Sequence, residues 1–207
     1  MSDPISLVAI RSARFPSAFL RMDGSNVTQF QNGGSGTVNC QYYKQGSLPT
    51  PNIGNDEVFE LIPLNPEENG NGRFAIRSLS WGAFLRIDAS NVTQFQNGGS
   101  GTVNCQYYSP GTYPTNAHNG NLEVHIPESG LDGNQRERFY VIAPDPFEHR
   151  YLRMDGSHVT QFQNGGSGTV NCQWYPGPVP YPTSVQQYEA LEIIPLTTSS
   201  PVVTPLP

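Results

Sequence analysis

The sequence predicts an all-β protein built from three related four-stranded units, and three observations lead to this prediction. A segment of 21 residues, DGSNVTQFQNGGSGTVNCQYY at positions 23–43, returns almost unchanged at 88–108 and at 155–175. Glycine (21 residues) and proline (19 residues) are abundant in a chain of 207 residues, which suits short strands and many turns. No stretch shows the sustained 3.6-residue hydrophobic period of an amphipathic helix.

Each unit is expected to contain four short strands separated by turn-rich segments. In unit 1 the apolar runs predict strands at 5–12, 18–23, 37–43 and 58–64. Counterparts of its first strand lie at 72–79 and 138–144, and counterparts of its fourth strand at 122–128 and 190–196. The second and third strands recur in the longer aligned segments 19–43, 84–108 and 151–175, which brings the expected total to twelve strands.

Three pseudo-symmetric units of four strands predict a β-trefoil, with a β-prism as the alternative. The equivalent residues Leu20, Leu85 and Leu152 set the repeat at 65 and then 67 residues. A closed threefold barrel removes the exposed strand edges that repeated strands otherwise leave open to aggregation. Residues 1–196 are therefore expected to form one domain, with repeats at approximately 1–65, 66–132 and 133–196. The Pro-rich tail, 197–207, is expected to lie outside the barrel.

The motif FLRMDGSNVT…GGSGTVNCQYY…VFELIPL resembles the fascin-like branch of the β-trefoil proteins. The resemblance extends over all three units, and it implies the trefoil fold. The branch includes carbohydrate-binding modules, lectin-like proteins and actin-bundling proteins, so it implies no single activity. Ricin-type trefoil lectins carry Gln-x-Trp, whereas Trp174 directly follows Gln173 here, and no ricin-type site is carried across.

Charge and hydropathy exclude several classes of partner. The formal net charge is −6 and no Lys/Arg cluster is present, which argues against binding to nucleic acid or to an anionic membrane. No run approaches 18 apolar residues, so membrane insertion is not expected. The start, MSDPISLVAIRSARF, lacks the pattern of a signal peptide, which predicts cytoplasmic synthesis and leaves non-classical release open. The oligomeric state is not predicted.

The three cysteines, Cys40, Cys105 and Cys172, hold equivalent positions in the units. An odd number of cysteines without a C-x-x-C pattern argues against a disulfide framework. The alternation in TVNCQYY places each cysteine on the barrel side of its strand, where second-shell partners for a metal are lacking. Buried, reduced thiols are expected, with no metal and no cofactor.

The same alternation turns a second set of side chains away from the barrel, and these are the candidate ligand-binding residues. An aspartate, an asparagine, a glutamine and a tyrosine recur in each unit, with two glycines that would let backbone approach a ligand. Carboxylate and amide groups suit sugar hydroxyls, and an aromatic face suits the C–H side of a sugar ring. The competing interpretation is that Asp-Gly-Ser is turn chemistry and that Asn and Gln satisfy loop backbone. The candidates are Asp23, Gly33, Gly34, Asn39, Gln41 and Tyr43; Asp88, Gly98, Gly99, Asn104, Gln106 and Tyr108; and Asp155, Gly165, Gly166, Asn171, Gln173 and Tyr175.

The predicted function is that of a multivalent lectin, a carbohydrate-binding protein with up to three equivalent sites and glycans or glycoconjugates as partners. Loops at 48–50, 113–115 and 181–183 are expected to wall these sites. No recurring pair of carboxylates or nucleophile and base supports an enzyme, and repeated weak sites gain from avidity. The alternatives are an actin-bundling protein like the fascins and a trefoil-type protease inhibitor acting through its variable loops.

Overall fold

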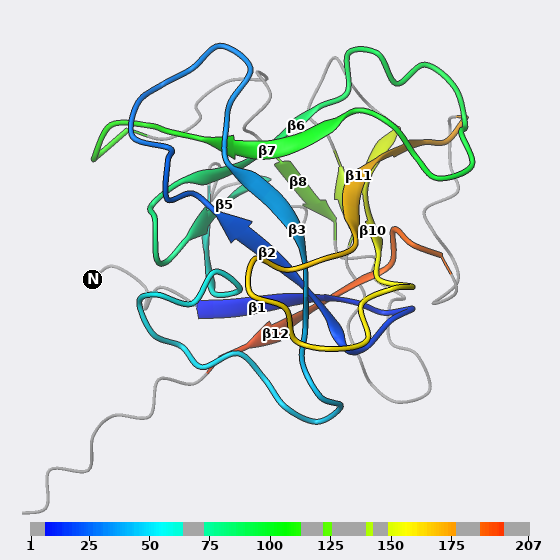
Figure 1. Cartoon of the computed structure of the whole chain (residues 1–207). Helices are drawn as coiled ribbons and strands as arrows, with labels where there is room; N and C mark the ends of the chain where they lie inside the picture. Colours follow the sequence, from blue (N-terminus) through cyan, green and yellow to red (C-terminus); the bar gives the residue numbers. More distant parts are fainter. Residues whose placement is uncertain are drawn as a thin grey trace, which may run out of the picture.

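The computed structural model describes residues 7–63, 73–112, 122–125, 140–142, 149–176 and 187–196. These residues form strands and loops without a helix, so none of them belongs to a helix that could span a membrane. Figure 1 shows the strands, which confirm the predicted order of four per unit. They are β1 (Leu7–Ser12), β2 (Ala18–Asp23), β3 (Thr37–Tyr42), β4 (Phe59–Pro63), β5 (Arg73–Ser78), β6 (Phe84–Asp88), β7 (Thr102–Gln106), β8 (Leu122–His125), β9 (Tyr140–Ile142), β10 (Arg150–Asp155), β11 (Thr169–Trp174) and β12 (Leu191–Pro195).

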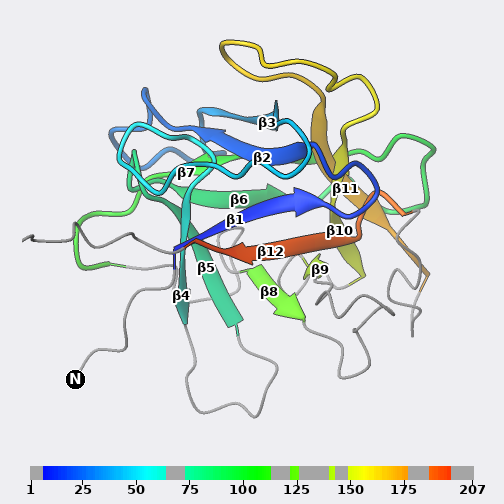
Figure 2. The same ribbon diagram turned by 90° about the horizontal axis from the view of Figure 1, so that it is seen from below.

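The strands form two layers of a β-trefoil. The first and fourth strands of the units make the barrel wall, where β12, β1, β4, β5, β8 and β9 pair antiparallel in that order. The second and third strands make three hairpins, β2–β3, β6–β7 and β10–β11, each joined to the wall through its first strand. In Figure 2 the hairpins β2–β3 and β6–β7 lie above the barrel strands β1 and β12, and β10–β11 stands at their right. The predicted fold class is confirmed.

The core repeats with the units. Leu20 faces Cys40 across the first hairpin, and the same register places Leu85 opposite Cys105 and Leu152 opposite Cys172. All six side chains are fully buried, which confirms the predicted equivalence of the leucines and the burial of the cysteines. Each buried leucine contributes about 1.5–3 kcal/mol to folding through the area it removes from water.

The three thiols are expected to react slowly with thiol reagents in the native protein. They are free, and burial raises the pKa of each to about 12, so the reactive thiolate is scarce at pH 8. An absorbance assay with an aromatic disulfide should show slow labelling in buffer and rapid labelling of three thiols per chain in denaturant. Equally fast labelling in both solutions would show that these positions are open to solvent.

Candidate functional site

The loop that follows the second strand of each unit lies on the third strand of another unit. Backbone bridges join Ser35 to Cys105, Ser100 to Cys172 and Ser167 to Cys40, with N···O distances of 2.7–2.8 Å. Unit 1 thus holds unit 2, unit 2 holds unit 3 and unit 3 holds unit 1. Figure 1 shows the three loops, in blue, green and yellow, passing to the neighbouring hairpin. We call each of these contacts a junction. One surface binds a different surface at every junction, and the rotation closes the ring.

The repeated glutamines fasten these junctions. The Nε2 atom of Gln41 donates to the backbone oxygen of Gln163 at 2.7 Å, and its Oε1 accepts from the Gln163 N–H at 3.2 Å. The same two bonds join Gln106 to Gln31 and Gln173 to Gln96. The glutamines point away from the barrel, but the neighbouring loop covers them, so they are not open to a ligand: Gln41, Gln106 and Gln173 are 2–3% exposed.

The repeated asparagines and glycines serve the same contact. Asn39 donates to the backbone oxygen of Gly165 at 2.8 Å, and Asn104 and Asn171 bond Gly33 and Gly98 in the same way. A Cβ atom on Gly34 would lie 2.5 Å from Asn104 Oδ1, and Gly99 and Gly166 approach Asn171 and Asn39 equally closely. The close backbone approach expected at these glycines is therefore an approach to the next unit. The interpretation that Asn and Gln satisfy loop backbone describes these bonds.

The repeated aspartates organise the turn after the second strand. Asp23, Asp88 and Asp155 each accept the backbone N–H two residues later at 3.1 Å, and each pairs with the arginine two residues earlier at 3.0–3.2 Å. The hydrogen bond from the Ser90 hydroxyl, with the Ser90 N–H and Arg86, holds the pKa of Asp88 below its ordinary value against desolvation. These contacts are the turn chemistry that the sequence left open as an alternative.

The repeated tyrosines are half-buried, and two of them, Tyr43 and Tyr175, donate to a buried acid. Tyr43 packs edge-on to Phe19, and its hydroxyl donates to Glu57 Oε2 at 3.0 Å. Tyr175 likewise donates to Glu189 at 2.8 Å. The exposed rings belong instead to a constant phenylalanine in each loop, Phe30, Phe95 and Phe162, which are 55–65% exposed. Phe30 and Phe95 stand edge-on to Tyr108 and Tyr175 of the next unit.

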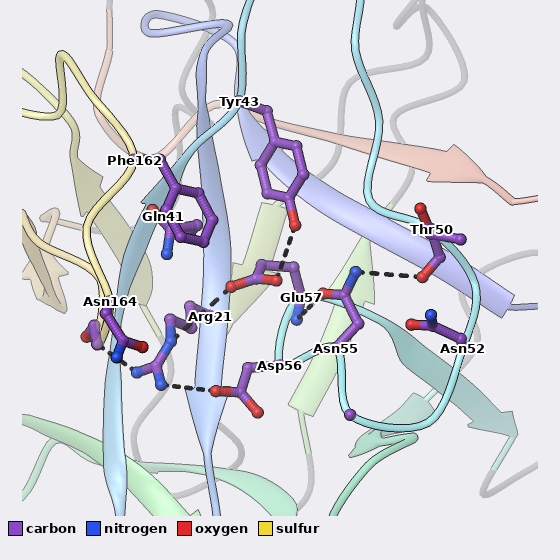
Figure 3. Close-up of a pocket in the computed structure, with 12 residues that line it drawn as sticks. Arg21, Gln41, Tyr43, Thr50, Asn52, Asn55, Asp56, Glu57, Phe162 and Asn164 are labelled. Carbon is purple, nitrogen blue, oxygen red and sulfur yellow. Dashed lines mark hydrogen bonds and ion pairs between the residues drawn. The ribbon is translucent and has the colours of Figure 1, made fainter.

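A pocket of about 300 Å³ opens where the loop of unit 3 meets unit 1. Figure 3 shows the chain of contacts at its floor, from Tyr43 through Glu57 and Arg21 to Asp56. Three of the predicted site residues line it, Gln41, Tyr43 and Gly165, whereas Asp23 and Asn39 do not. The remaining lining residues are Arg21, Thr50, Asn52, Gly54, Asn55, Asp56, Glu57, Phe162 and Asn164. Thr50, from the loop at 48–50, lines this pocket. The loops at 113–115 and 181–183 lie outside the described residues.

Largely buried ion pairs make up the floor of the pocket. Arg21 Nη2 lies 2.6 Å from Asp56 Oδ2, and Arg21 Nε lies 3.8 Å from Glu57 Oε1. Asp56 also accepts the indole N–H of Trp81, from unit 2, at 2.6 Å. Burial raises the pKa of the Glu57 carboxyl above its ordinary value, and burial together with the nearby Glu57 raises that of the Tyr43 hydroxyl. The arrangement offers a ligand fixed carboxylate oxygens rather than a reactive nucleophile.

The three junctions differ around this floor. Unit 3 repeats the acid, since Glu189 follows Tyr175 by the same spacing as Glu57 follows Tyr43. In place of Asp56, however, unit 3 has Tyr188, whose ring lies 4.1 Å from the guanidinium carbon of Arg153. In unit 2 the segment before the fourth strand is two residues shorter. Counted back from that strand, Gly120 takes the place of the acid, in a segment outside the described residues. The junctions are therefore not chemically equivalent.

Sequence reasoning missed Asp56, Glu57 and Phe162. The predicted site residues are those that are identical in all units, whereas the acid is present in only two of them. The equal spacing of tyrosine and glutamate in units 1 and 3 could have found Glu57. The phenylalanine was visible as a constant large apolar residue inside a polar, glycine-rich loop. Among the described residues, no cluster of three His, Cys, Asp or Glu side chains is placed to hold a metal ion.

The stability of the wild type should fall relative to that of Glu57→Gln as the pH rises above about 4.5. The folded state raises the pKa of Glu57, so ionising this buried carboxyl costs free energy that glutamine does not pay. The matched variant Asp88→Asn should show the opposite sign. The folded pKa of Asp88 is lowered, so its contribution is present above about pH 3.8 and lost as the pH falls. Urea unfolding from pH 3 to 8 measures both differences, and parallel slopes for the two variants would contradict this assignment.

Comparison with known proteins shows the fold. No known family model and no curated protein sequence matches this chain. Among solved structures, the designed threefold-symmetric protein ThreeFoil matches with a TM-score of 0.53 and 11% identity, over 92% of this chain and 99% of that one. The SDF2-like protein from Arabidopsis thaliana matches with a TM-score of 0.51 and 12% identity, over 94% and 97%.

A third match is to a larger chain. The S. cerevisiae protein O-mannosyltransferase Pmt1–Pmt2 complex bound to the sugar donor matches with a TM-score of 0.53 and 13% identity, over 92% of this chain and 24% of that one. Sequence identities this low establish a shared β-trefoil fold and nothing finer.

Proposed function

We propose that this β-trefoil is a non-catalytic carbohydrate-binding protein whose principal site is the pocket between unit 1 and the loop of unit 3. The observation that carries the proposal is the combination of an exposed ring, Phe162, with a polar pocket whose charged floor is held in place. A sugar needs both features, because its hydroxyls require fixed donors and acceptors and its C–H face packs on an aromatic ring.

The rigidity of the floor supports binding of a small polar ligand. Tyr43, Glu57, Arg21 and Asp56 constrain one another through contacts of 2.6–3.8 Å, so little side-chain entropy is left to lose when a ligand binds. Asn52, Asn55 and Asn164 add amide groups at the wall. One of the neighbours in fold belongs to a mannosyltransferase complex bound to a sugar donor, which is consistent with glycan partners.

Up to three glycan sites, one per junction, are proposed, and their affinities are expected to differ. The loop phenylalanine recurs at every junction, but the acid of the floor recurs only as Glu189, and Tyr188 replaces Asp56 there. Affinity should therefore be highest at the junction that carries Asp56 and Glu57. Membership of the fascin-like branch remains part of the proposal.

Replacing Phe162 with alanine should weaken glycan binding roughly tenfold, since aromatic packing contributes on the order of 0.5–1.5 kcal/mol beyond the area buried. The matched control is Ile53→Ala, because Ile53 is a large apolar residue of the pocket loop that is 80% exposed and does not line the pocket. A glycan array identifies the ligand, and calorimetry with that ligand measures the affinities of both variants. Equal losses in the two variants, or none in either, would count against a site at Phe162. Release of free sugar during incubation would contradict the non-catalytic assignment.

A further inference from the structure

The buried charges around the pocket are unbalanced. Of the described residues that line it, only Arg21 is cationic, whereas Asp56 and Glu57 are both acids. Asp23, which does not line the pocket, adds a third carboxylate 3.2 Å from the same guanidinium. One cation facing three anions leaves the region acidic when all of them are ionised. The side chains of Arg21, Asp56 and Glu57 are only 7–15% exposed, so solvent screens this charge less than it would at the surface.

The guanidinium of Arg21 already donates hydrogen bonds to groups of the protein. Its Nη2 donates to Asp56 at 2.6 Å and to Asp23 at 3.2 Å, and its Nη1 donates to the backbone oxygen of Gly165 at 3.0 Å. Arginine usually binds anions with two parallel N–H groups of its planar fork. Here one edge of the fork is turned toward Asp23 and Asp56 and the other toward a backbone carbonyl. An anionic ligand would have to displace a buried carboxylate to gain such a contact.

Acceptors, in contrast, remain available. A carboxylate oxygen can accept more than one hydrogen bond, whereas Glu57 Oε2 receives the Tyr43 hydroxyl and each Asp56 oxygen receives one N–H. The asparagine amides of the wall add further acceptors together with uncharged N–H donors, so the charged groups that remain open to a ligand are the acceptors. The complementary ligand therefore supplies donors, which hydroxyl and amino groups do and carboxylate and sulfate groups do not.

We infer that this pocket selects non-acidic glycans, either neutral sugars or sugars that carry amino groups, and rejects sialylated, sulfated and uronic-acid glycans. The inference rests on the proposed function and names the substrate class of the same site. Asp56 is the specificity-determining residue. It neutralises Arg21 at this junction, while unit 3 has an uncharged tyrosine in its place.

The test compares matched glycans on the full-length protein. A printed array carrying neutral oligosaccharides, their sulfated and uronic-acid analogues and their 2-amino analogues should show acidic members bound at least tenfold more weakly than neutral ones. Amino-bearing members should bind as well as neutral ones or better. Raising the salt concentration should narrow the gap between acidic and neutral glycans, because it screens the repulsion. Acidic glycans bound as tightly as neutral ones would overturn the inference while leaving glycan binding intact, and an array without any bound glycan would remove both.

Two variants with the same charge change test whether Asp56 causes the discrimination against acidic glycans. Asp56→Asn should raise the ratio of acidic to neutral binding at least fivefold, since it removes one negative charge and the shortest ion pair of Arg21, whose bonds to Asp23 and Gly165 remain. Glu60→Gln makes the same charge change on the barrel wall, where Glu60 pairs with Arg77, and should leave the ratio unchanged. Reading the ratio rather than the absolute affinity separates selectivity from a general loss of binding. If Asp56→Asn does not fold, the salt dependence of the wild type still decides the question, and a ratio that is unaffected in both experiments contradicts the inference.

Discussion

Gly34→Ala is expected to be among the most destabilising single-methyl changes in the protein. A Cβ atom at this position would lie 2.5 Å from Asn104 Oδ1 and 2.7 Å from the backbone oxygen of Cys105, both in the next unit. Overpacking against groups held by the neighbouring strand costs about 1–3 kcal/mol. The φ angle of +68° adds ~1–2 kcal/mol of left-handed strain for any residue with a side chain. Equilibrium denaturation by urea measures the loss.

The preceding glycine supplies the control. Gly33 has a φ angle of +114°, and a Cβ atom there would meet nothing within 4 Å. Gly33→Ala therefore carries backbone strain without the clash. The two variants should differ by the overpacking cost, with Gly34→Ala the less stable. Equal stabilities would mean that the loop does not press on the strand of unit 2 as described.

Gln106→Leu is expected to open the same junction by a different route. The change preserves bulk but removes the bond from Nε2 to the Gln31 oxygen at 2.7 Å and the two that Oε1 accepts, from Gln31 N at 3.2 Å and Tyr107 N at 3.0 Å. Backbone groups left unpaired in a buried place cost about 1–3 kcal/mol each. The loss should therefore reach at least ~2 kcal/mol, because more than one group is left unpaired.

Gln31→Ala tests whether Gln31 contributes to the junction through its side chain or only through its backbone, which the Gln106 side chain binds. The side chain of Gln31 is exposed, and its residue contributes to the junction through main-chain atoms that alanine retains. Its stability should stay within ~0.5 kcal/mol of the wild type, as for most surface changes. A loss as large as that of Gln106→Leu would place the energetic contact elsewhere in the loop.

The fold could be predicted because its signal lies within the repeat. The offset between Leu20, Leu85 and Leu152 and the alternation in TVNCQYY were enough to define units, strands and the buried side of each hairpin. These signals are local or periodic, so a single sequence displays them directly.

The environment of the constant polar residues could not be predicted in the same way. Gln41 does point away from the barrel, but residues 122 positions later fold over it. A contact of that separation leaves no trace in local alternation. It does explain the near-identity of the repeated segment, since loop and strand are contiguous in sequence and each loop must fit the strand of another unit. A substitution in a loop must therefore remain compatible with the third strand of another unit, and a substitution in that strand with the loop.

The acids of the pocket could not be predicted from the repeat because they are not constant among the units. Asp56 and Glu57 lie in the segment between the third and fourth strands, where the units have diverged most. The residues that are identical in all units are those that hold the junctions together. The pocket is formed in part by residues that differ between junctions, such as Asp56.

Backbone amide chemical shifts, followed during titration with the glycan that binds best on the array, show whether the pocket between unit 1 and the loop of unit 3 binds a sugar. The largest shift changes are expected at residues 50–57 and 162–165, with smaller changes at the other two junctions. Shift changes confined to the barrel wall, or equal in size at all three junctions, would contradict this expectation.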